Sequence, residues 1–333
     1  MALSARKKYM LNLNMTKMAH AVALVSTVAF GALSTTPAMA AAPMAKFSAP
    51  GFYRLMVGDF EVTALSDGTA DLPMDQLLQE APAKTNKALA NAFLKSPLET
   101  SVNAYLINTG SKLVLIDTGA GSLFGPTLGK LVANLKASGY QPAEIDEIYL
   151  THLHPDHVGG LAAEGNLTFP NATVRADQRD SDYWLSHANM EHAPASMKGF
   201  FQGATASLKP YIDANKYQPF SANTELTPGI KSYASYGHTA GHTSYVIESH
   251  GSKMIVVGDL IHVPAVQLNN PDVTIGFDTD PKAAVEARGR VFKEAAADGD
   301  LVAAAHIQFP GLGHLRLKGK SYQWIPVNYT QMR

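Results

Sequence analysis

The 333-residue chain contains no cysteine. Disulfide bonds, thiolate nucleophiles and thiolate metal ligands are therefore excluded, and a bound metal ion must be held by nitrogen and oxygen atoms. Clustered positive charge is also lacking, because no run of five or more Lys or Arg residues occurs. Phosphate binding depends on such clusters, so nucleic acid is not expected as a partner.

Residues 1–40 have the three-part layout of an export signal. Four basic side chains and no acidic one accompany an apolar run at 21–33, and the end at Ala40 has the small-x-small pattern that signal peptidase reads. This run is shorter than the roughly 20 residues that span a bilayer. We expect cleavage after Ala40, which leaves 23 basic and 28 acidic residues and a net charge of −5. The mature chain would be periplasmic or secreted, without membrane contact; an uncleaved anchor and a start at Met15 are the alternatives.

Short strand-like and helix-like segments alternate along the mature chain, 41–333. Alternating or β-rich stretches between turn residues predict strands at 53–57, 60–65, 102–108, 113–116, 147–150, 230–236, 244–249, 253–257 and 301–304. Apolar residues at helical spacing predict helices at 126–138, 178–189, 199–212 and 281–297. The alternation favours an α/β fold with central sheets and outer helices. No linker or repeat divides the mature chain, so we expect one domain.

The segment THLHPDHVGG at 151–160 places four potential metal ligands within six positions: His152, His154, Asp156 and His157. Imidazole and carboxylate are the ligands expected of Zn²⁺ or a similar divalent ion. The four side chains converge if the segment is a loop that leaves a strand, with Pro155 holding His154 extended and the two glycines allowing a tight entry into a helix. A chance cluster of surface histidines is disfavoured, because the pattern is rare at this histidine content.

Four ligands are too many for one catalytic ion that keeps a water position, and too few for two ions. Three further candidates directly follow predicted strands: His238, Asp259 and His306. If these segments meet, seven side chains suffice for two ions. Two divalent ions lower the pKa of a shared water toward neutrality and stabilise the charge that develops when it attacks. The pattern therefore predicts a binuclear hydrolase that uses a bridging hydroxide.

The motifs THLHPDH, GHTAGHT, VVGDL and AAAHIQFPGLGH, in this order, resemble the metallo-β-lactamase superfamily of binuclear hydrolases. Within it, the mature chain is similar to the methyl parathion hydrolases and their lactonase and aryl-esterase (dihydrocoumarin hydrolase-like) relatives. The resemblance implies an αββα sandwich with two divalent ions at one edge of the sheets, and a homodimer. It also implies the division of ligands, with one ion held by His152, His154 and His238, the other by Asp156, His157 and His306, and Asp259 bridging both. Zn²⁺ is the expected metal, and Mn²⁺, Co²⁺ or Fe²⁺ are the alternatives.

The resemblance also suggests roles for residues around the ligands. Asp117, which ends a predicted strand, is expected to accept the second N–H of a ligand imidazole, although a turn-stabilising role is the alternative. His242, four residues after His238, is expected to support the site without binding an ion. Phe124, Trp184 and Phe200 match positions that line an aromatic substrate pocket, whereas large aromatic side chains more usually lie in a core.

Four residues depart from the pattern expected of the methyl parathion hydrolases: Leu77, His262, Ile275 and Phe277 stand where we expect Arg, Leu, Thr and Leu. All four are expected near the pocket rim. His262 follows Asp259 by three positions, where related lactonases carry a tyrosine that assists at the carbonyl. We expect His262 to donate a hydrogen bond to a lactone or ester oxygen, or to interact with a metal-bound group; a simple pocket-wall residue is the alternative.

The sequence thus predicts hydrolysis of a small-molecule substrate, with Asp259, His262 and Asp156 as the catalytic side chains. Aromatic lactones such as dihydrocoumarin, or aryl esters, are the expected substrates, and phosphotriesters are expected to be slow, promiscuous ones. Three alternatives remain: a hydrolase whose main substrates are phosphotriesters of the methyl parathion type, an iron-dependent redox enzyme, and a binding protein with a structural metal. The full set of seven ligands favours two hydrolytic ions over the last two.

Overall fold

The computed structural model describes residues 42, 44–45 and 49–331. The chain divides into two units, Met1–Phe47 and Ser48–Arg333, and all elements below belong to the second. The expected export signal, residues 1–40, lies outside the described residues. Within the described part of the chain, no helix combines the length and the hydrophobicity that a membrane crossing requires.

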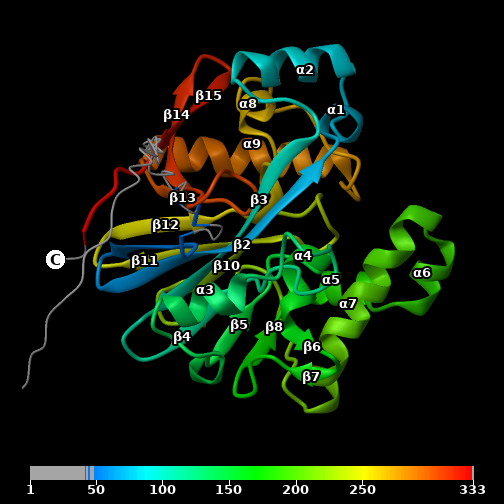
Figure 1. Ribbon diagram of the computed structural model, residues 1–333, viewed down its shortest axis with the longest axis vertical. Helices are drawn as coiled ribbons and strands as arrows, with labels where there is room; N and C mark the ends of the chain where they lie inside the picture. The colour runs from blue at the N-terminus through cyan, green and yellow to red at the C-terminus, as the bar shows by residue number, and fades with distance from the viewer. Residues whose placement is uncertain (1–41, 43, 46–48, 332–333) are drawn as a thin grey trace, which may run out of the picture. The chain divides into compact units, whose positions relative to one another are not determined.

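Two β-sheets form the centre of the second unit (Figure 1). The first has the strand order β1 (Phe52–Val57), β2 (Phe60–Leu72), β3 (Leu98–Asn108), β4 (Leu113–Ile116), β5 (Glu147–Tyr149) and β8 (Thr173–Arg175). The second has the order β15 (Ser321–Pro326), β14 (Leu312–Lys318), β13 (Leu301–Ala303), β12 (Ser252–Val256), β11 (Thr243–Ser249), β10 (Ile230–Ala234) and β9 (Glu225–Thr227). A two-stranded sheet, β6 (Ala162–Ala163) and β7 (Asn166–Leu167), lies apart from both.

Parallel pairing occurs in both sheets and decides where the loops lie. Strands β4, β5 and β8 run parallel, as do β12 and β13, whereas the other neighbours in the two central sheets are antiparallel. Parallel neighbours bring their carboxyl ends to the same edge of a sheet, which is where α/β folds place their ligands. The loops after β4 and β5 therefore meet at one edge, and so do the loops after β12 and β13.

Helices cover the outer faces of the two sheets (Figure 1). Their bounds are α1 (Met74–Leu77), α2 (Pro82–Asn91), α3 (Leu131–Ala137), α4 (Pro155–Val158), α5 (Gln178–Trp184), α6 (His187–His192), α7 (Ala195–Asp213), α8 (Pro264–Gln267) and α9 (Pro281–Asp298). Apolar side chains of α3 and α7 pack on the first sheet, and those of α9 pack on the second. The order of layers is helix, sheet, sheet, helix, so the predicted αββα sandwich is confirmed.

The alternation of side chains along the strands builds a separate core on each side of a sheet. In β4, Val114 and Ile116 belong to the apolar layer between the two sheets, and Leu115 belongs to the layer beneath α3 and α7. Met254 and Val256 of β12 join the layer between the sheets, while Ile255 faces α9. Each such buried side chain stabilises the fold by about 1.5–3 kcal/mol.

The helix α9 shows how local sequence sets an outer layer. The side chain of Asp280 accepts a hydrogen bond from Ala283 N (3.0 Å), Pro281 occupies the first turn, and Gly299 ends the helix with a φ of 71°. Its buried positions recur every three or four residues: Ala284, Ala287, Arg288, Val291, Phe292 and Ala295. This spacing gives one buried stripe, apolar except for Arg288, and its apolar side chains cover the outer face of the second sheet.

Two predicted helices differ in the structure. The helix expected at 126–138 begins at Leu131, because the carboxylate of Asp67 accepts hydrogen bonds from Gly129 N and Leu131 N (both 3.0 Å) and holds the preceding residues as a loop. The helix expected at 178–189 is two helices, because the Ser186 side chain accepts a hydrogen bond from Asn189 N and starts α6. Elements that the sequence did not predict are α1, α2, α8, β6, β7, β8, β9, β14 and β15.

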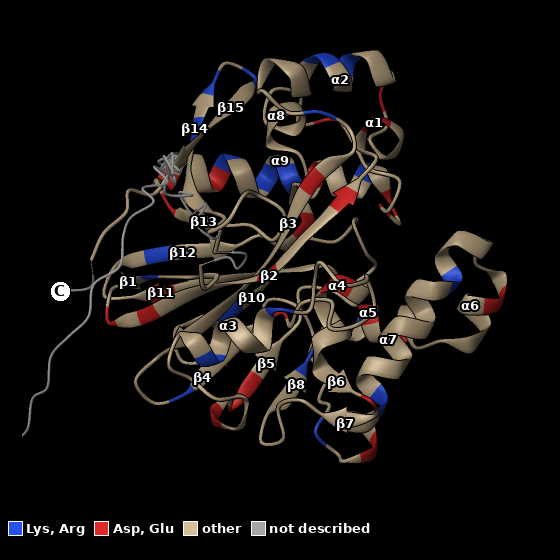
Figure 2. Cartoon of the chain, in the orientation of Figure 1, with Lys and Arg blue, Asp and Glu red and all other residues tan. Residues whose placement is uncertain are grey.

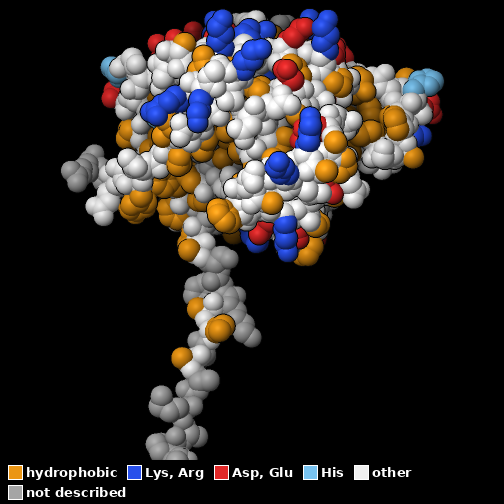
Figure 3. Space-filling model, turned by 90° about the horizontal axis from the view of Figure 1, so that it is seen from above, with side chains coloured by type: hydrophobic (Ala, Val, Ile, Leu, Met, Phe, Trp, Pro, Cys, Tyr) orange, Lys and Arg blue, Asp and Glu red, His pale blue; other side chains and the backbone are white. Residues whose placement is uncertain are grey.

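Charged residues are dispersed over the described surface. Lys and Arg lie on many elements and do not concentrate along one of them (Figure 2). On the face shown in Figure 3 they stand among apolar, uncharged and acidic side chains.

Candidate metal centre

The candidate ligands lie on loops that leave strands of both sheets. Four of them follow β5, one follows β10, one lies in the short helix η3 (Gly258–Leu260) after β12, and one follows β13: His152, His154, Asp156, His157, His238, Asp259 and His306. The sandwich packs these strand ends against one another. The structure therefore brings together residues that lie up to 154 positions apart in the chain.

The loop after β5 turns sharply into α4. His154 has extended backbone angles (φ −69°, ψ 150°) and Pro155 is the first helical residue, as predicted. A Cβ atom on Gly159 would lie 2.1 Å from the carbonyl oxygen of Ala120, and one on Gly160 would lie 2.0 Å from that of Thr118. Glycine is therefore required for this turn to pack against the loop after β4.

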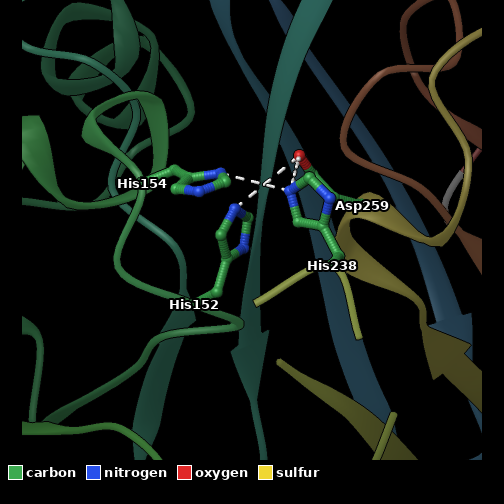
Figure 4. A group of neighbouring side chains, drawn as sticks. All are labelled: His152, His154, His238 and Asp259. Carbon is green, nitrogen blue, oxygen red and sulfur yellow. Dashed lines mark hydrogen bonds and ion pairs between the residues drawn. The ribbon is translucent and has the colours of Figure 1, made fainter. Parts of the chain in front are cut away.

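The first group of ligand atoms comprises those of His152, His154, His238 and Asp259 (Figure 4), which all lie within 4.8 Å of one another. His238 Nε2 lies 3.1 Å from His154 Nδ1 and 3.3 Å from Asp259 Oδ2. His152 Nε2 lies 3.7 Å from the same carboxylate oxygen. Three of these residues are at most 2% exposed and Asp259 is 3% exposed, so the group is shielded from bulk solvent.

The second group, Asp156, His157 and His306, lies beside the first. Asp156 Oδ2 is 3.6 Å from both His157 Nε2 and His306 Nε2. Asp259 reaches this group as well, with Oδ1 3.2 Å from His157 Nε2 and Oδ2 3.0 Å from His306 Nε2. One carboxylate therefore contacts both groups, as expected for a bridging ligand.

The donor atoms fit divalent ions. His152 Nε2, His157 Nε2 and Asp259 Oδ1 are buried without a hydrogen-bond partner, which costs free energy unless another group binds them. An ion bound at 2.0–2.2 Å by nitrogen and oxygen sets neighbouring ligand atoms about 3.3 Å apart. The distances of 3.0–3.7 Å between these atoms match that spacing. The seven residues of the cluster therefore fit two divalent ions that share Asp259.

The pKa values within the cluster shift in opposite directions. Burial alone would lower the pKa values of His157, His238 and His306, but neighbouring carboxylates, Asp259 above all, raise them. Burial lowers the pKa values of His152 and His154 well below the usual range, so both imidazoles are neutral at neutral pH and have a lone pair to offer. Burial alone would raise the pKa of Asp259, but the neighbouring His306 and His157 hold it well below its usual range. The bridging carboxylate is therefore ionised.

Asp117 orients one of the ligands. Its Oδ2 lies 2.8 Å from His157 Nδ1 and accepts that N–H, while its Oδ1 accepts a hydrogen bond from Thr151 N (2.8 Å). The residue directly follows β4 and has a φ of 62°, a left-handed conformation that aspartate tolerates better than most residues. Because Nδ1 carries the proton, Nε2 of His157 is left to face the cluster. The geometry agrees with the role predicted for Asp117.

Two further partners of the ligands were not predicted. Asp278 Oδ1 accepts a hydrogen bond from His238 Nδ1 (2.8 Å), and the carbonyl oxygen of Ser101 accepts one from His306 Nδ1 (2.9 Å). Both bonds fix the tautomer that points Nε2 at the cluster. Neither partner belongs to a local motif, so no signal in the sequence marked them.

His242 supports the site from behind and belongs to neither group. Its Nε2 accepts a hydrogen bond from Asp259 N (3.0 Å), and its Nδ1 lies 2.9 Å from Ser235 Oγ. Burial lowers the pKa of His242 to about 3, so the ring is neutral and Nε2 acts as an acceptor. His242 therefore positions the backbone of Asp259, and His238 is the histidine that faces the cluster, as expected.

Asp180 joins the two loops that carry the first group. Its Oδ2 accepts a hydrogen bond from Leu153 N (2.8 Å), between two ligands, and its Oδ1 accepts one from Gly241 N (2.6 Å), in the loop that carries His238. The side chain is fully buried, and burial raises its pKa to about 6. Sequence reasoning missed Asp180, because a single aspartate in a helix has no distinguishing pattern.

Replacement of Asp180 by asparagine is expected to weaken metal binding about 10- to 100-fold, the usual effect of losing a group that orients metal ligands. The side-chain nitrogen of the asparagine would face the backbone N–H of either Leu153 or Gly241. That N–H group would then lose its hydrogen-bond acceptor. Competition with a chromophoric chelator measures the affinity. Asp182→Asn, in the same helix but exposed, is the control; equal affinities for the two variants would contradict the role of Asp180.

A cavity opens beside the cluster. Five residues of the cluster and its surroundings line it: His154, Asp156, Asp259, His262 and His306. Its remaining lining is apolar except for Thr100, and consists of Ala70, Leu72, Val102, Phe124, Leu128, Phe200 and Phe277. Three of the predicted pocket aromatics, Phe124, Phe200 and Phe277, are therefore in place.

Three other predicted pocket residues do not line this cavity. Trp184 is 1% exposed and packs edge-on against the ring of His154, with ring centroids 5.0 Å apart. Leu77 and Ile275 belong to a neighbouring apolar cluster that packs against Phe277. Trp184 and Ile275 are buried in the core, and Leu77 is partly buried against it. Their influence on the cavity passes through the residues that they support.

Known protein sequences resemble this chain over the region that carries the candidate ligands. Residues 98–306 match the sequence model of the metallo-beta-lactamase superfamily, and this stretch contains all seven candidate ligands. An N-acyl homoserine lactonase of Bacillus sp is 26% identical over 205 residues, which cover 55% of this chain and 72% of the relative.

Solved structures agree with the sequence comparison. The hydrolase AbOPH, described as a member of the beta lactamase superfamily, matches with a TM-score of 0.82 and 36% identity over 86% of this chain and 100% of that one. AidC, a dizinc quorum-quenching lactonase in complex with a homoserine product, matches with a TM-score of 0.78 and 27% identity. That match covers 84% of this chain and 99% of AidC.

Proposed function

The chain belongs to the metallo-β-lactamase superfamily and is a metal-dependent hydrolase, and from this premise we propose that it cleaves lactones and aryl esters, with aromatic lactones such as dihydrocoumarin as favoured substrates. The observation that carries the proposal is the cavity, in which aromatic side chains stand next to Asp156, Asp259 and His306. A flat apolar substrate could place its carbonyl at the cluster and its ring against these walls.

The aromatic walls suit a flat ring. The ring centroids of Phe200 and Phe277 lie 6.0 Å apart, and Phe200 also packs edge-on against His154 at 5.0 Å. Phe124 is 40% exposed and so stands at the solvent side of the cavity. Aromatic side chains bind aromatic ligands through large contact areas and offset or edge-to-face stacking. The walls would hold the substrate ring and exclude water from the bond that breaks.

The same walls disfavour a substrate with an amide side chain. Thr100 is the polar lining residue outside the metal cluster and His262, and its hydroxyl already donates to the carbonyl oxygen of Leu98 (3.1 Å). An amide moved from water to such a surface loses hydrogen bonds and costs free energy. We therefore infer that aromatic lactones react faster than the acyl homoserine lactones on which the two lactonases named above act.

The chemistry follows from the ligand set. We propose Zn²⁺ at both positions, held by the seven residues described above, since imidazole and carboxylate suit zinc. Such ions supply Lewis acidity and a water of lowered pKa. Water adds to the carbonyl carbon through its oxygen and gives up one proton, the bond to the leaving oxygen breaks, and that oxygen takes up the proton. We propose that Asp156, whose side chain is 20% exposed and lines the cavity, carries that proton.

A hydrolysis panel on the zinc-loaded protein tests the proposal. It compares dihydrocoumarin and phenyl acetate with an acyl homoserine lactone, a β-lactam and a dimethyl aryl phosphotriester, each read as kcat/KM above an Asp259→Asn background. We expect dihydrocoumarin to exceed the phosphotriester and the acyl homoserine lactone by about tenfold or more, the discrimination that pocket contacts typically give. If the phosphotriester reacts fastest, this proposal is wrong and the protein is a phosphotriesterase instead.

A further inference from the structure

His262 lies in the turn after Asp259 and faces the same carboxylate as the ligands. Its Nε2 is 3.1 Å from Asp259 Oδ2, the oxygen that His306 Nε2 also approaches at 3.0 Å. Atoms of these three residues lie within 4.8 Å of one another. The ring of His262 stacks on that of His306 with centroids 5.1 Å apart and planes inclined by 16°. Nε2 of His262 therefore points into the metal cluster.

A buried amide holds His262 in this position. Gln267 is fully buried, and its Oε1 accepts hydrogen bonds from the backbone nitrogens of His262 (2.8 Å) and Val263 (3.0 Å). The Nε2 of Gln267 donates in turn to the carbonyl oxygen of Val273 (3.1 Å). The turn is therefore built by a satisfied network, and His262 itself is 3% exposed, so its side chain has little freedom to point elsewhere.

The spacing of His262 matches that of a ligand. Neighbouring atoms around an ion bound at 2.0–2.2 Å are about 3.3 Å apart. The distance from His262 Nε2 to Asp259 Oδ2 is 3.1 Å, which lies between the corresponding distances from His306 Nε2 (3.0 Å) and His152 Nε2 (3.7 Å). Nδ1 of His262 is buried without a partner, so no other contact fixes the tautomer in favour of an Nε2–H donor.

We propose that His262 is a further imidazole ligand, which binds through Nε2 to the ion held by Asp156, His157, His306 and Asp259. This ion would have three imidazoles where the seven-residue set provides two. The additional ligand would increase the affinity of the site for this ion. It would also leave fewer coordination positions for water and substrate. Because His262 also lines the cavity, the bond would lie on the side from which a substrate reaches the ion.

Metal binding tests this ligand directly, and its outcome does not depend on which ester the protein cleaves. Zinc-free wild type, His262→Leu and His262→Gln are titrated with Zn²⁺ against a chromophoric chelator. Glutamine can still donate a hydrogen bond to Asp259, but an amide is a poor zinc ligand. We expect both variants to bind the ion at Asp156, His157 and His306 about tenfold or more weakly. Their affinity for the ion at His152, His154 and His238 should stay unchanged. His314→Gln, whose ring contacts the carbonyl oxygens of Gly299 and Asp300, serves as the control.

The glutamine variant decides between a ligand and a hydrogen-bond donor. If His262→Gln binds both ions like the wild type, His262 acts on Asp259 or on the pocket wall, and the proposal is overturned. A second measurement needs no variant. In the cobalt-loaded wild type, each ligating imidazole contributes one strongly shifted exchangeable N–H resonance, and six such signals are expected where the seven-residue set predicts five. Five signals would overturn the proposal as well.

Discussion

Asp259→Asn protein is expected to lose activity by a factor on the order of 1,000 or more and to retain fewer than two zinc ions per chain. The carboxylate contacts both ligand groups, at 3.0 Å from His306 Nε2 and 3.3 Å from His238 Nε2. An amide of the same shape keeps the packing but removes the negative charge that two neighbouring cations require. Steady-state kinetics on an aromatic lactone and elemental analysis of the dialysed protein give the two quantities.

The control for this variant is Asp272→Asn, an exposed carboxylate in the segment after α8. It should keep full metal content and activity, because its side chain lies outside the cluster. If Asp259→Asn retained two ions and hydrolysed the lactone at a rate close to that of the wild type, a bridging role for Asp259 would be ruled out.

Removal of metal is expected to abolish hydrolysis and to lower the melting temperature by about 10 °C. Buried donors such as His152 Nε2 and His157 Nε2 have no protein partner, so the ions supply interactions that the folded chain lacks by itself. An ion at a thousandfold excess over its Kd stabilises the native state by about 4 kcal/mol, and two ions act together. Thermal unfolding before and after chelation measures the change.

Readdition of metal provides the control for chelation. Zn²⁺ should restore both the melting temperature and the activity, whereas Mg²⁺ should restore neither, because it prefers oxygen ligands and this cluster is rich in imidazole. A chelated protein with unchanged melting temperature and full activity would show that neither the stability nor the chemistry depends on divalent ions.

The fold and the ligands were largely predictable because their signals are local. Strand alternation located most of the two sheets, and the THLHPDH segment together with three strand-end residues indicated the ligands. Pairs such as Asp180 with Gly241, or His238 with Asp278, were not predictable because each joins segments that carry no pattern of their own. Trp184 was assigned to the pocket by resemblance, yet its ring is buried behind His154. The export signal and the homodimer stay predictions.

The helix expected at 126–138 illustrates why boundaries were less certain than elements. Its apolar spacing was helical throughout, but Asp67, some sixty residues earlier, takes up the N–H groups of Gly129 and Leu131. Gly129 also adopts a φ of 79°, which a helix does not allow. A distant carboxylate thus overrides local spacing, and residues 126–130 join the loop that contains Phe124, a residue of the cavity wall.

The division of the ligands between the two sheets has a consequence for the order of assembly. The loop after β5 supplies four donors from the first sheet, and the remaining three come from segments that follow strands of the second. Neither half of the chain holds a complete shell for both cations. Both ions can therefore be bound only after the two halves of the chain have packed together, which makes zinc uptake a late step of folding. A fragment that ends before β10 would lack the three ligands from the second sheet and could not bind both ions.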